Sequence, residues 1–191
     1  KFDDHLPIYR QSEMWERSRV DLDCTTMGRW VMGCGELLMP LVDHMKQDIV
    51  ASDSVQADET GVQVMNEKGR KNKSKSFMWV FKTAGDKNSK IVYHYSPSRS
   101  TDVISSFLSG FEGYLQSDGY TGYSKFAKTK LGKVISIGCW AHARRKFVEI
   151  TKVAAKKGIA YEAVKLIADL YKIERAVKAE GLNSEEIWGR R

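Results

Sequence analysis

Two aspartates occupy positions where carboxylates could do chemistry. Asp58 lies inside "SVQADETGVQV", a stretch with strand character, and Asp118 directly follows the short strand-like segment "GYLQS". Acidic residues are poor strand formers and costly to bury, so a solvated strand end is the simplest interpretation of either one. Paired carboxylates instead repel each other unless a cation lies between them. Mg²⁺ accepts such oxygen ligands, and paired ions of this kind support phosphodiester chemistry.

The surrounding hydrophobic pattern predicts how these carboxylates are positioned. From residue 54 onward it predicts the order β-β-β-α-β-α-β-α, in which three antiparallel strands are followed by strands reached through helices. This α/β arrangement of a mixed sheet covered by helices has the strand order of the ribonuclease H-like fold. In that architecture the middle of the first strand and the end of the fourth lie side by side. We assign Phe77, Trp79 and Trp140 to the core.

The hydrophobic pattern of the sequence divides the chain into three expected segments. Residues 1–52 read as a helical lead-in, in which Pro40 should break or kink a helix. Residues 53–151 carry the sheet, and residues 152–191 carry a further amphipathic helical segment.

Composition narrows the class of protein. The chain has 191 residues, of which 42% are hydrophobic and 29% charged, as in a soluble globular protein. Three cysteines without a framework spacing suit a reducing cytoplasm, and no apolar run is long enough for a transmembrane helix. The net charge of +7 is compatible with a polyanionic partner. Because the chain begins with Lys1, we expect it to be a piece of a longer protein.

Several motifs carry a resemblance to a known family. The stretches "ADETGVQV", "KSKSFMWVF", "YSPSRS", "GYLQSDGYTGY" and "GCWAHARRKF" resemble transposases of the insertion-sequence-66 family, as does the lead-in "HLPIYRQSEMWERSRVDL". The resemblance implies a DDE-type transposase with a ribonuclease H-like catalytic core that acts on transposon DNA ends with Mg²⁺ or Mn²⁺. On this resemblance Asp58 is the first acid of the triad and Asp118 the second.

The third acid has two candidate positions. Glu149 lies on the helix expected after the fifth strand. However, Cys139-x-x-His142 resembles a signature of DDE transposases that carry a helical insertion before the final glutamate. The helical segment would then be that insertion, and the glutamate would lie beyond Arg191, which is the interpretation we favour. Three further acids on this segment are expected to be surface charges: Glu162, Glu174 and Glu180.

Cys139 and His142 do not indicate a zinc site, because no second Cys/His pair has ligand spacing. His142 either lies near the active site, where it contacts DNA phosphate or orders the acidic residues, or it is structural. Cys139 is expected in the core.

Basic and aromatic side chains supply candidate DNA contacts. A helix start after the fifth strand carries three basic residues that either bind phosphate or face solvent: Arg144, Arg145 and Lys146. A polar loop carries four more that either grip DNA or are simply exposed: Arg70, Lys71, Lys73 and Lys75. Beside Asp118, Tyr120 and Tyr123 either stack on an unpaired base or belong to the core.

The sequence therefore predicts the catalytic-core fragment of a DNA transposase. Water would cleave a phosphodiester at the transposon end, and the freed 3′-hydroxyl would attack target DNA. The alternatives are another ribonuclease H-like nuclease and a non-catalytic DNA-binding or assembly module. Expected partners are DNA, further copies of the chain in the active complex and accessory transposition proteins. We expect no membrane association and a place in the bacterial cytoplasm at the nucleoid.

Overall fold

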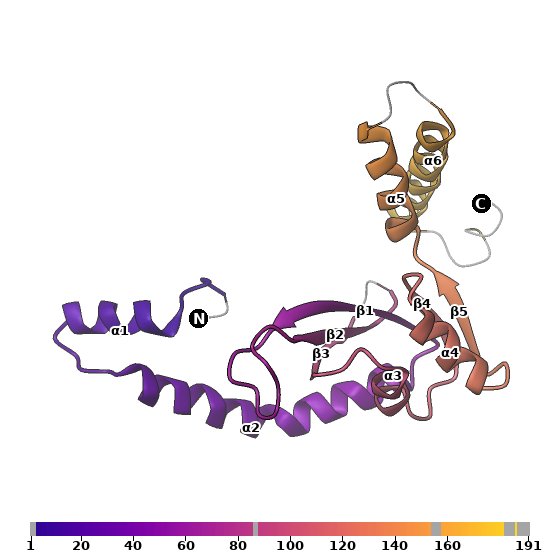
Figure 1. Ribbon diagram of the computed structural model, residues 1–191. Helices are drawn as coiled ribbons and strands as arrows, with labels where there is room; N and C mark the ends of the chain where they lie inside the picture. The colour runs from indigo at the N-terminus through magenta and orange to yellow at the C-terminus, as the bar shows by residue number, and fades with distance from the viewer. Residues whose placement is uncertain (1–2, 86–87, 154–157, 182–185, 187–191) are drawn as a thin grey trace.

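A mixed sheet organises the structure, a computed structural model that describes residues 3–85, 88–153, 158–181 and 186 (Figure 1). Its five strands lie in the order β3-β2-β1-β4-β5. Strands β1 to β3 form an antiparallel meander, whereas β4 runs parallel to β1 and β5 runs parallel to β4. The expected ribonuclease H-like strand order is confirmed. The strands are β1 (Ser54–Gln63), β2 (Lys75–Thr83), β3 (Ile91–Ser96), β4 (Gly113–Ser117) and β5 (Val134–Gly138).

Helices flank the sheet in two groups. Helices α2 to α4 pack against one face of the sheet, and α5 and α6 form a hairpin that projects from the end of β5 (Figure 1). The division into residues 1–52, 53–151 and 152–191 stays a prediction. None of the helices in the described ranges is long and apolar enough to cross a bilayer. The helices are α1 (Ile8–Arg17), α2 (Cys24–Val50), α3 (Thr101–Phe107), α4 (Thr121–Thr129), α5 (Trp140–Val153) and α6 (Ile159–Glu180).

The core lies between the sheet and α2 to α4. Successive side chains of a strand point to opposite faces, so alternate residues of β1 and β2 enter this core. Trp79 is fully buried, as expected, and Phe77 packs against the core while remaining partly exposed. Phe81 is fully buried and stacks on Phe107 of α3, with ring centroids 3.8 Å apart. Aromatic packing of this kind fixes the helical layer onto the meander.

Of the two outcomes expected at Pro40, a break or a kink, the break does not occur, because α2 continues from Cys24 to Val50. Proline inside a helix costs about 3 kcal/mol, since it removes one backbone hydrogen bond and crowds the preceding turn. Tertiary contacts oppose that cost here. Beyond the proline, α2 packs four apolar side chains against the core: Val42, Met45, Ile49 and Val50.

The opposite face of the sheet is polar near its centre and apolar towards its edges. Even-numbered residues of β1 point to this face, including Gln56 and Asp58, because Val55 and Ala57 are buried on the other. Six large side chains on β3, β4 and β5 are exposed: Ile91, Tyr93, Tyr95, Tyr114, Ile135 and Ile137. Asp58 therefore lies on the open side of the sheet, where a ligand can reach it.

Candidate active site

The register between β1 and β4 aligns Asp58 with Asp118. These parallel strands pair Gln56 with Gln116, and the Gln56 side-chain amide donates a hydrogen bond to Gln116 Oε1 at 2.7 Å. Each aspartate lies two residues beyond its glutamine, Asp58 still within β1 and Asp118 directly after the end of β4. Adjacent strands are about 4.8 Å apart. The glutamine contact therefore places the middle of β1, which carries Asp58, beside the end of β4, which Asp118 follows.

The two carboxylates differ in their hydrogen bonds. Oδ1 of Asp58 accepts from the backbone N–H of Glu59 at 2.9 Å, and its side chain is 48% exposed. Oδ1 of Asp118, the residue directly after β4, accepts from the backbone N–H of Tyr120 at 2.9 Å. Burial raises the pKa of Tyr123 far above its usual range, and its hydrogen bond to Glu59 and the charges of Glu59, Asp58 and Asp118 raise it further.

Helix α5 brings His142 to Asp58. The helix begins directly after β5, and Nε2 of His142 lies 3.5 Å from Oδ2 of Asp58. Its Nδ1 is buried and accepts or donates no hydrogen bond among the described residues. Asp58 and His142 both line a hollow of about 230 Å³, together with half-buried Cys139 and with Gln116. The expectation that Cys139 is packed in the core is therefore wrong, because this residue lines the wall of the hollow.

Glu149 lies apart from these groups. It is exposed on α5, and its carboxylate is 4.0 Å from Lys146 Nζ. It is seven residues beyond His142, which corresponds to roughly 10 Å along a helix axis that leads away from the sheet (Figure 1). Among the other acids of this region, Glu162 and Glu180 are exposed, whereas Glu174 is half-buried.

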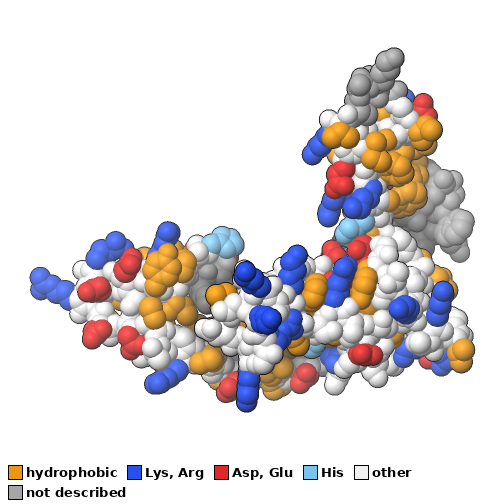
Figure 2. Space-filling view, in the orientation of Figure 1, with side chains coloured by type: hydrophobic (Ala, Val, Ile, Leu, Met, Phe, Trp, Pro, Cys, Tyr) orange, Lys and Arg blue, Asp and Glu red, His pale blue; other side chains and the backbone are white. Residues whose placement is uncertain are grey.

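The predicted basic residues after β5 lie in a groove of the hairpin. Arg144 and Arg145 line a hollow of about 560 Å³ between α5 and α6, which Lys172 and Arg175 of α6 also line. Lys146 is exposed on the same helix. Lys and Arg side chains gather at the base of the hairpin, near a histidine and acidic side chains (Figure 2). A phosphate backbone would meet several cations here.

The predicted basic loop between β1 and β2 is different. The Arg70 guanidinium lies 3.3 Å from Glu67 and donates hydrogen bonds to the backbone oxygens of Lys75, at 2.9 Å, and Pro97. Arg70 therefore ties this loop to the segment after β3. Two of the remaining predicted DNA contacts, Lys71 and Lys73, are exposed.

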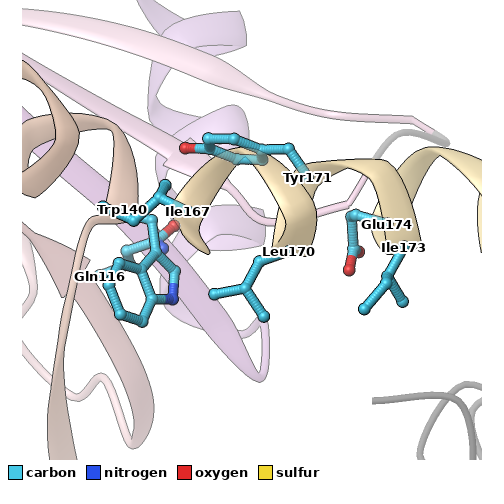
Figure 3. A pocket seen from close by; sticks show the side chains of 7 residues that line it. All are labelled: Gln116, Trp140, Ile167, Leu170, Tyr171, Ile173 and Glu174. Atoms are coloured by element: carbon cyan, nitrogen blue, oxygen red, sulfur yellow. The ribbon is translucent and has the colours of Figure 1, made fainter. Parts of the chain in front are cut away.

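The predicted aromatic residues have three different environments. Tyr123 is fully buried and meets Trp79 edge to face at 6.2 Å, so it is a core residue. Tyr120 is partly buried against the same core. The expectation that Trp140 is a core residue is wrong, because its side chain is 55% exposed. It begins α5, and with Gln116 of β4 and Leu170 of α6 it lines a hollow of about 370 Å³ (Figure 3).

The comparisons place the chain in a family. The sequence model described as Transposase IS66 family matches residues 1–191. The chain belongs to the IS66 transposase family. It is 29% identical to Uncharacterized protein y4qI of Sinorhizobium fredii (strain NBRC 101917 / NGR234), over 94% of this chain and 35% of the relative. It is 33% identical to Uncharacterized protein y4jD of the same strain, over 97% of this chain and 38% of the relative.

The match to relatives covers a limited part of them. This IS66-family chain spans little more than a third of the length of these curated relatives, at 35% and 38%. Among solved structures it is similar to a chain of the simian T-cell lymphotropic virus intasome in complex with PP2A regulatory subunit B56 gamma. That likeness has a TM-score of 0.35 and 10% identity, and covers 62% of this chain and 48% of the other.

The donors present suit part of a hard-cation site. Asp58 lines a hollow on the open face, Asp118 follows the end of the neighbouring strand β4, and both offer the oxygen ligands that Mg²⁺ prefers. Within the described ranges, no group of three or more His, Cys, Asp or Glu side chains is placed to hold a metal. The donor set of this IS66-family chain therefore fits a divalent ion that takes its remaining ligands from water or substrate.

Sequence reasoning missed one acidic residue of this region. Strand alternation places Glu59 on the face of β1 opposite Asp58, but the sequence did not indicate a partner for it. Glu59 is buried and paired with Arg99 and Tyr123. A carboxylate in a strand together with an arginine in "YSPSRS" was the available signal, because buried acids require partners.

Proposed function

We propose that this IS66-family chain carries the metal-binding part of a DDE-type DNA transposase, with Asp58 and Asp118 as ligands of Mg²⁺ or Mn²⁺. The observation that supports the proposal is the parallel β1–β4 register, with its Gln56–Gln116 hydrogen bond, which brings the strand of Asp58 beside the end of the strand that Asp118 follows. His142 lies beside the first of these aspartates, with Nε2 at 3.5 Å from Oδ2 of Asp58.

The proposed reaction divides its tasks among these residues. The ion, when bound, supplies Lewis-acid stabilisation of phosphoryl oxygens and lowers the pKa of water. Asp58 and Asp118 offer it anionic oxygens, and His142 Nε2 orients the Asp58 carboxylate from 3.5 Å. Water would cleave the phosphodiester at a transposon end, and the resulting 3′-hydroxyl would then attack target DNA.

DNA is the proposed partner, and the groove of the α5–α6 hairpin is its proposed contact. Arg144 and Arg145 face Lys172 and Arg175 across this groove, and Lys146 adds a further cation on α5. Such contacts position a phosphate backbone without reading its sequence, and they weaken with salt. Lys71 and Lys73 are secondary contacts. We also propose that the active complex contains further copies of the chain and accessory transposition proteins. Its proposed location is the bacterial cytoplasm, at the nucleoid.

The proposal is tested with the full-length protein and DNA that carries the transposon ends. We expect Mg²⁺- or Mn²⁺-dependent cleavage at the ends, followed by joining of the freed 3′ ends to a target plasmid. Cleavage without joined product would indicate a hydrolytic nuclease of the same fold. Salt-sensitive binding without either product would indicate a non-catalytic DNA-binding or assembly module.

Glu149 is not expected to serve as the third acid, because it lies about two helical turns from His142 and is paired with Lys146. The Glu149→Gln variant of the full-length protein should retain cleavage within about twofold, as for an exposed substitution worth no more than about 0.5 kcal/mol. Initial cleavage rates at saturating Mg²⁺ measure this. A loss comparable to that of Asp58→Asn would instead assign Glu149 to the triad.

A further inference from the structure

We propose that Glu59 is a positioning residue, which acts through Arg99 and Tyr120 to hold the loop that carries Asp118. The inference rests on the proposed function, since it concerns the alignment of Asp118 with Asp58. It adds a role for the acid that follows Asp58 in β1 and points to the opposite face of the sheet.

Glu59 is a buried charge with specific partners. Its side chain is 1% exposed, and Oε1 accepts a hydrogen bond from Arg99 Nε at 2.7 Å and forms an ion pair with Nη2 at 2.5 Å. Oε2 accepts from the Tyr123 hydroxyl at 2.5 Å. The raised pKa of Tyr123 keeps that hydroxyl protonated and able to donate. A buried carboxylate is costly without such partners, so Glu59 favours positions of the Arg99 guanidinium and the Tyr123 hydroxyl next to it, on the face of β1 opposite Asp58.

Arg99 connects this carboxylate to the Asp118 loop. Its guanidinium lies 4.1 Å from the centroid of the Tyr120 ring, a cation–π contact. Its backbone oxygen accepts a hydrogen bond from the Tyr120 hydroxyl. The Tyr120 backbone N–H in turn donates to Asp118 Oδ1 at 2.9 Å. A continuous set of contacts therefore runs from Glu59 to the carboxylate of Asp118.

Gly122 leaves the space that this arrangement needs. A Cβ atom at Gly122 would lie 2.3 Å from Cε1 of Tyr120, whereas a Cβ at Gly119 would meet nothing within 4 Å. The Tyr120 ring thus packs onto Gly122 in the first turn of α4, and Tyr123 of the same turn donates its hydroxyl hydrogen bond to Glu59. The loop from Asp118 to Tyr120 therefore leads into a helical turn whose two tyrosines are both linked to Glu59, Tyr123 directly and Tyr120 through Arg99.

A positioning role and a purely structural role predict different measurements. If Glu59 only stabilised the fold, its loss would lower hydrogen-exchange protection throughout the sheet. If it positions Asp118, the loss should concentrate at the Tyr120 amide, which binds the Asp118 carboxylate, and should weaken metal binding. Removing an outer partner of a metal ligand typically costs about tenfold or more in affinity.

The experiment compares Glu59→Gln with the wild type in the full-length protein, by amide hydrogen exchange and by Mn²⁺ titration followed by electron paramagnetic resonance. We expect at least about tenfold faster exchange at Tyr120, unchanged exchange at Trp79, and about tenfold weaker Mn²⁺ binding. Glu112→Gln is the matched control, because Glu112 is an exposed acid paired with Lys133. It should match the wild type in both measurements.

The remaining outcomes are decisive as well. Unchanged exchange at Tyr120, or a uniform loss of protection across the sheet, would overturn the inference. If Glu59→Gln does not fold, Gly122→Ala displaces the Tyr120 ring without touching the buried pair, and the same Tyr120 amide is read against Gly119→Ala. If the wild type binds Mn²⁺ no better than Asp58→Asn does, the proposed function fails, and the Tyr120 exchange alone still decides whether Glu59 holds this loop.

Discussion

Replacing Asp58 with asparagine is expected to abolish divalent-metal-dependent cleavage by the full-length protein, and Asp118→Asn should do the same. Asparagine keeps the size and shape of the side chain but removes the negative charge that a hard ion prefers. A bound ion contributes several kcal/mol of transition-state stabilisation in such chemistry. Losing about 4 kcal/mol corresponds to a roughly thousandfold lower rate. Initial rates with labelled transposon-end DNA, across a Mg²⁺ and Mn²⁺ titration, measure the change.

The matched control is Asp48→Asn. Asp48 is also an aspartate with a cationic neighbour, 3.3 Å from Lys90, but it lies on α2 at the other side of the sheet. Such partly exposed pairs contribute about 0–1 kcal/mol, so cleavage should be unchanged. Persistent cleavage by Asp58→Asn or Asp118→Asn, with a normal metal dependence, would show that these carboxylates are not the ligands.

Replacing Gly113 with alanine is expected to disrupt the start of β4 and, with it, the alignment of β4 with β1. Gly113 has φ +140°, and an added Cβ would lie 2.3 Å from the backbone oxygen of Asp53. That oxygen accepts the hydrogen bond of Tyr114 N–H at 2.9 Å, so it cannot move without loosening the β1–β4 pair. We expect a loss of about 3 kcal/mol in the free energy of unfolding, measured by denaturant titration.

A second strand glycine provides the control for this substitution. A Cβ at Gly61 in β1 would meet only the flexible Lys75 side chain, 3.8 Å away. Gly61→Ala should leave the free energy of unfolding unchanged or raise it by about 0.4–1 kcal/mol, through the reduced entropy of the unfolded chain. Equal stabilities for the two alanine variants would mean that the close approach of Gly113 to Asp53 does not constrain the sheet.

Local patterns were sufficient for the order of elements and for the two aspartates. The strand segments around Asp58 and before Asp118 are bounded by turn residues, and strand alternation places Glu59 opposite Asp58 whatever the rest of the fold does. Local reasoning failed at Trp140 and left open whether Pro40 breaks its helix or only kinks it. Propensity disfavours proline in a helix, but packing of the following turns onto the core outweighs it. Trp140 is large and apolar, yet it begins a helix that leaves the sheet.

The amino-acid sequence alone therefore established the fold class, the family resemblance and the candidate carboxylates, because each depends on neighbouring residues or on a linear motif. The tertiary structure was needed to bring His142 to Asp58 and Arg99 to Glu59. It also showed Glu149 facing solvent, away from the aspartates. These relations join residues far apart in the chain. They depend on strand register and on the direction in which α5 leaves the sheet, which no local preference specifies.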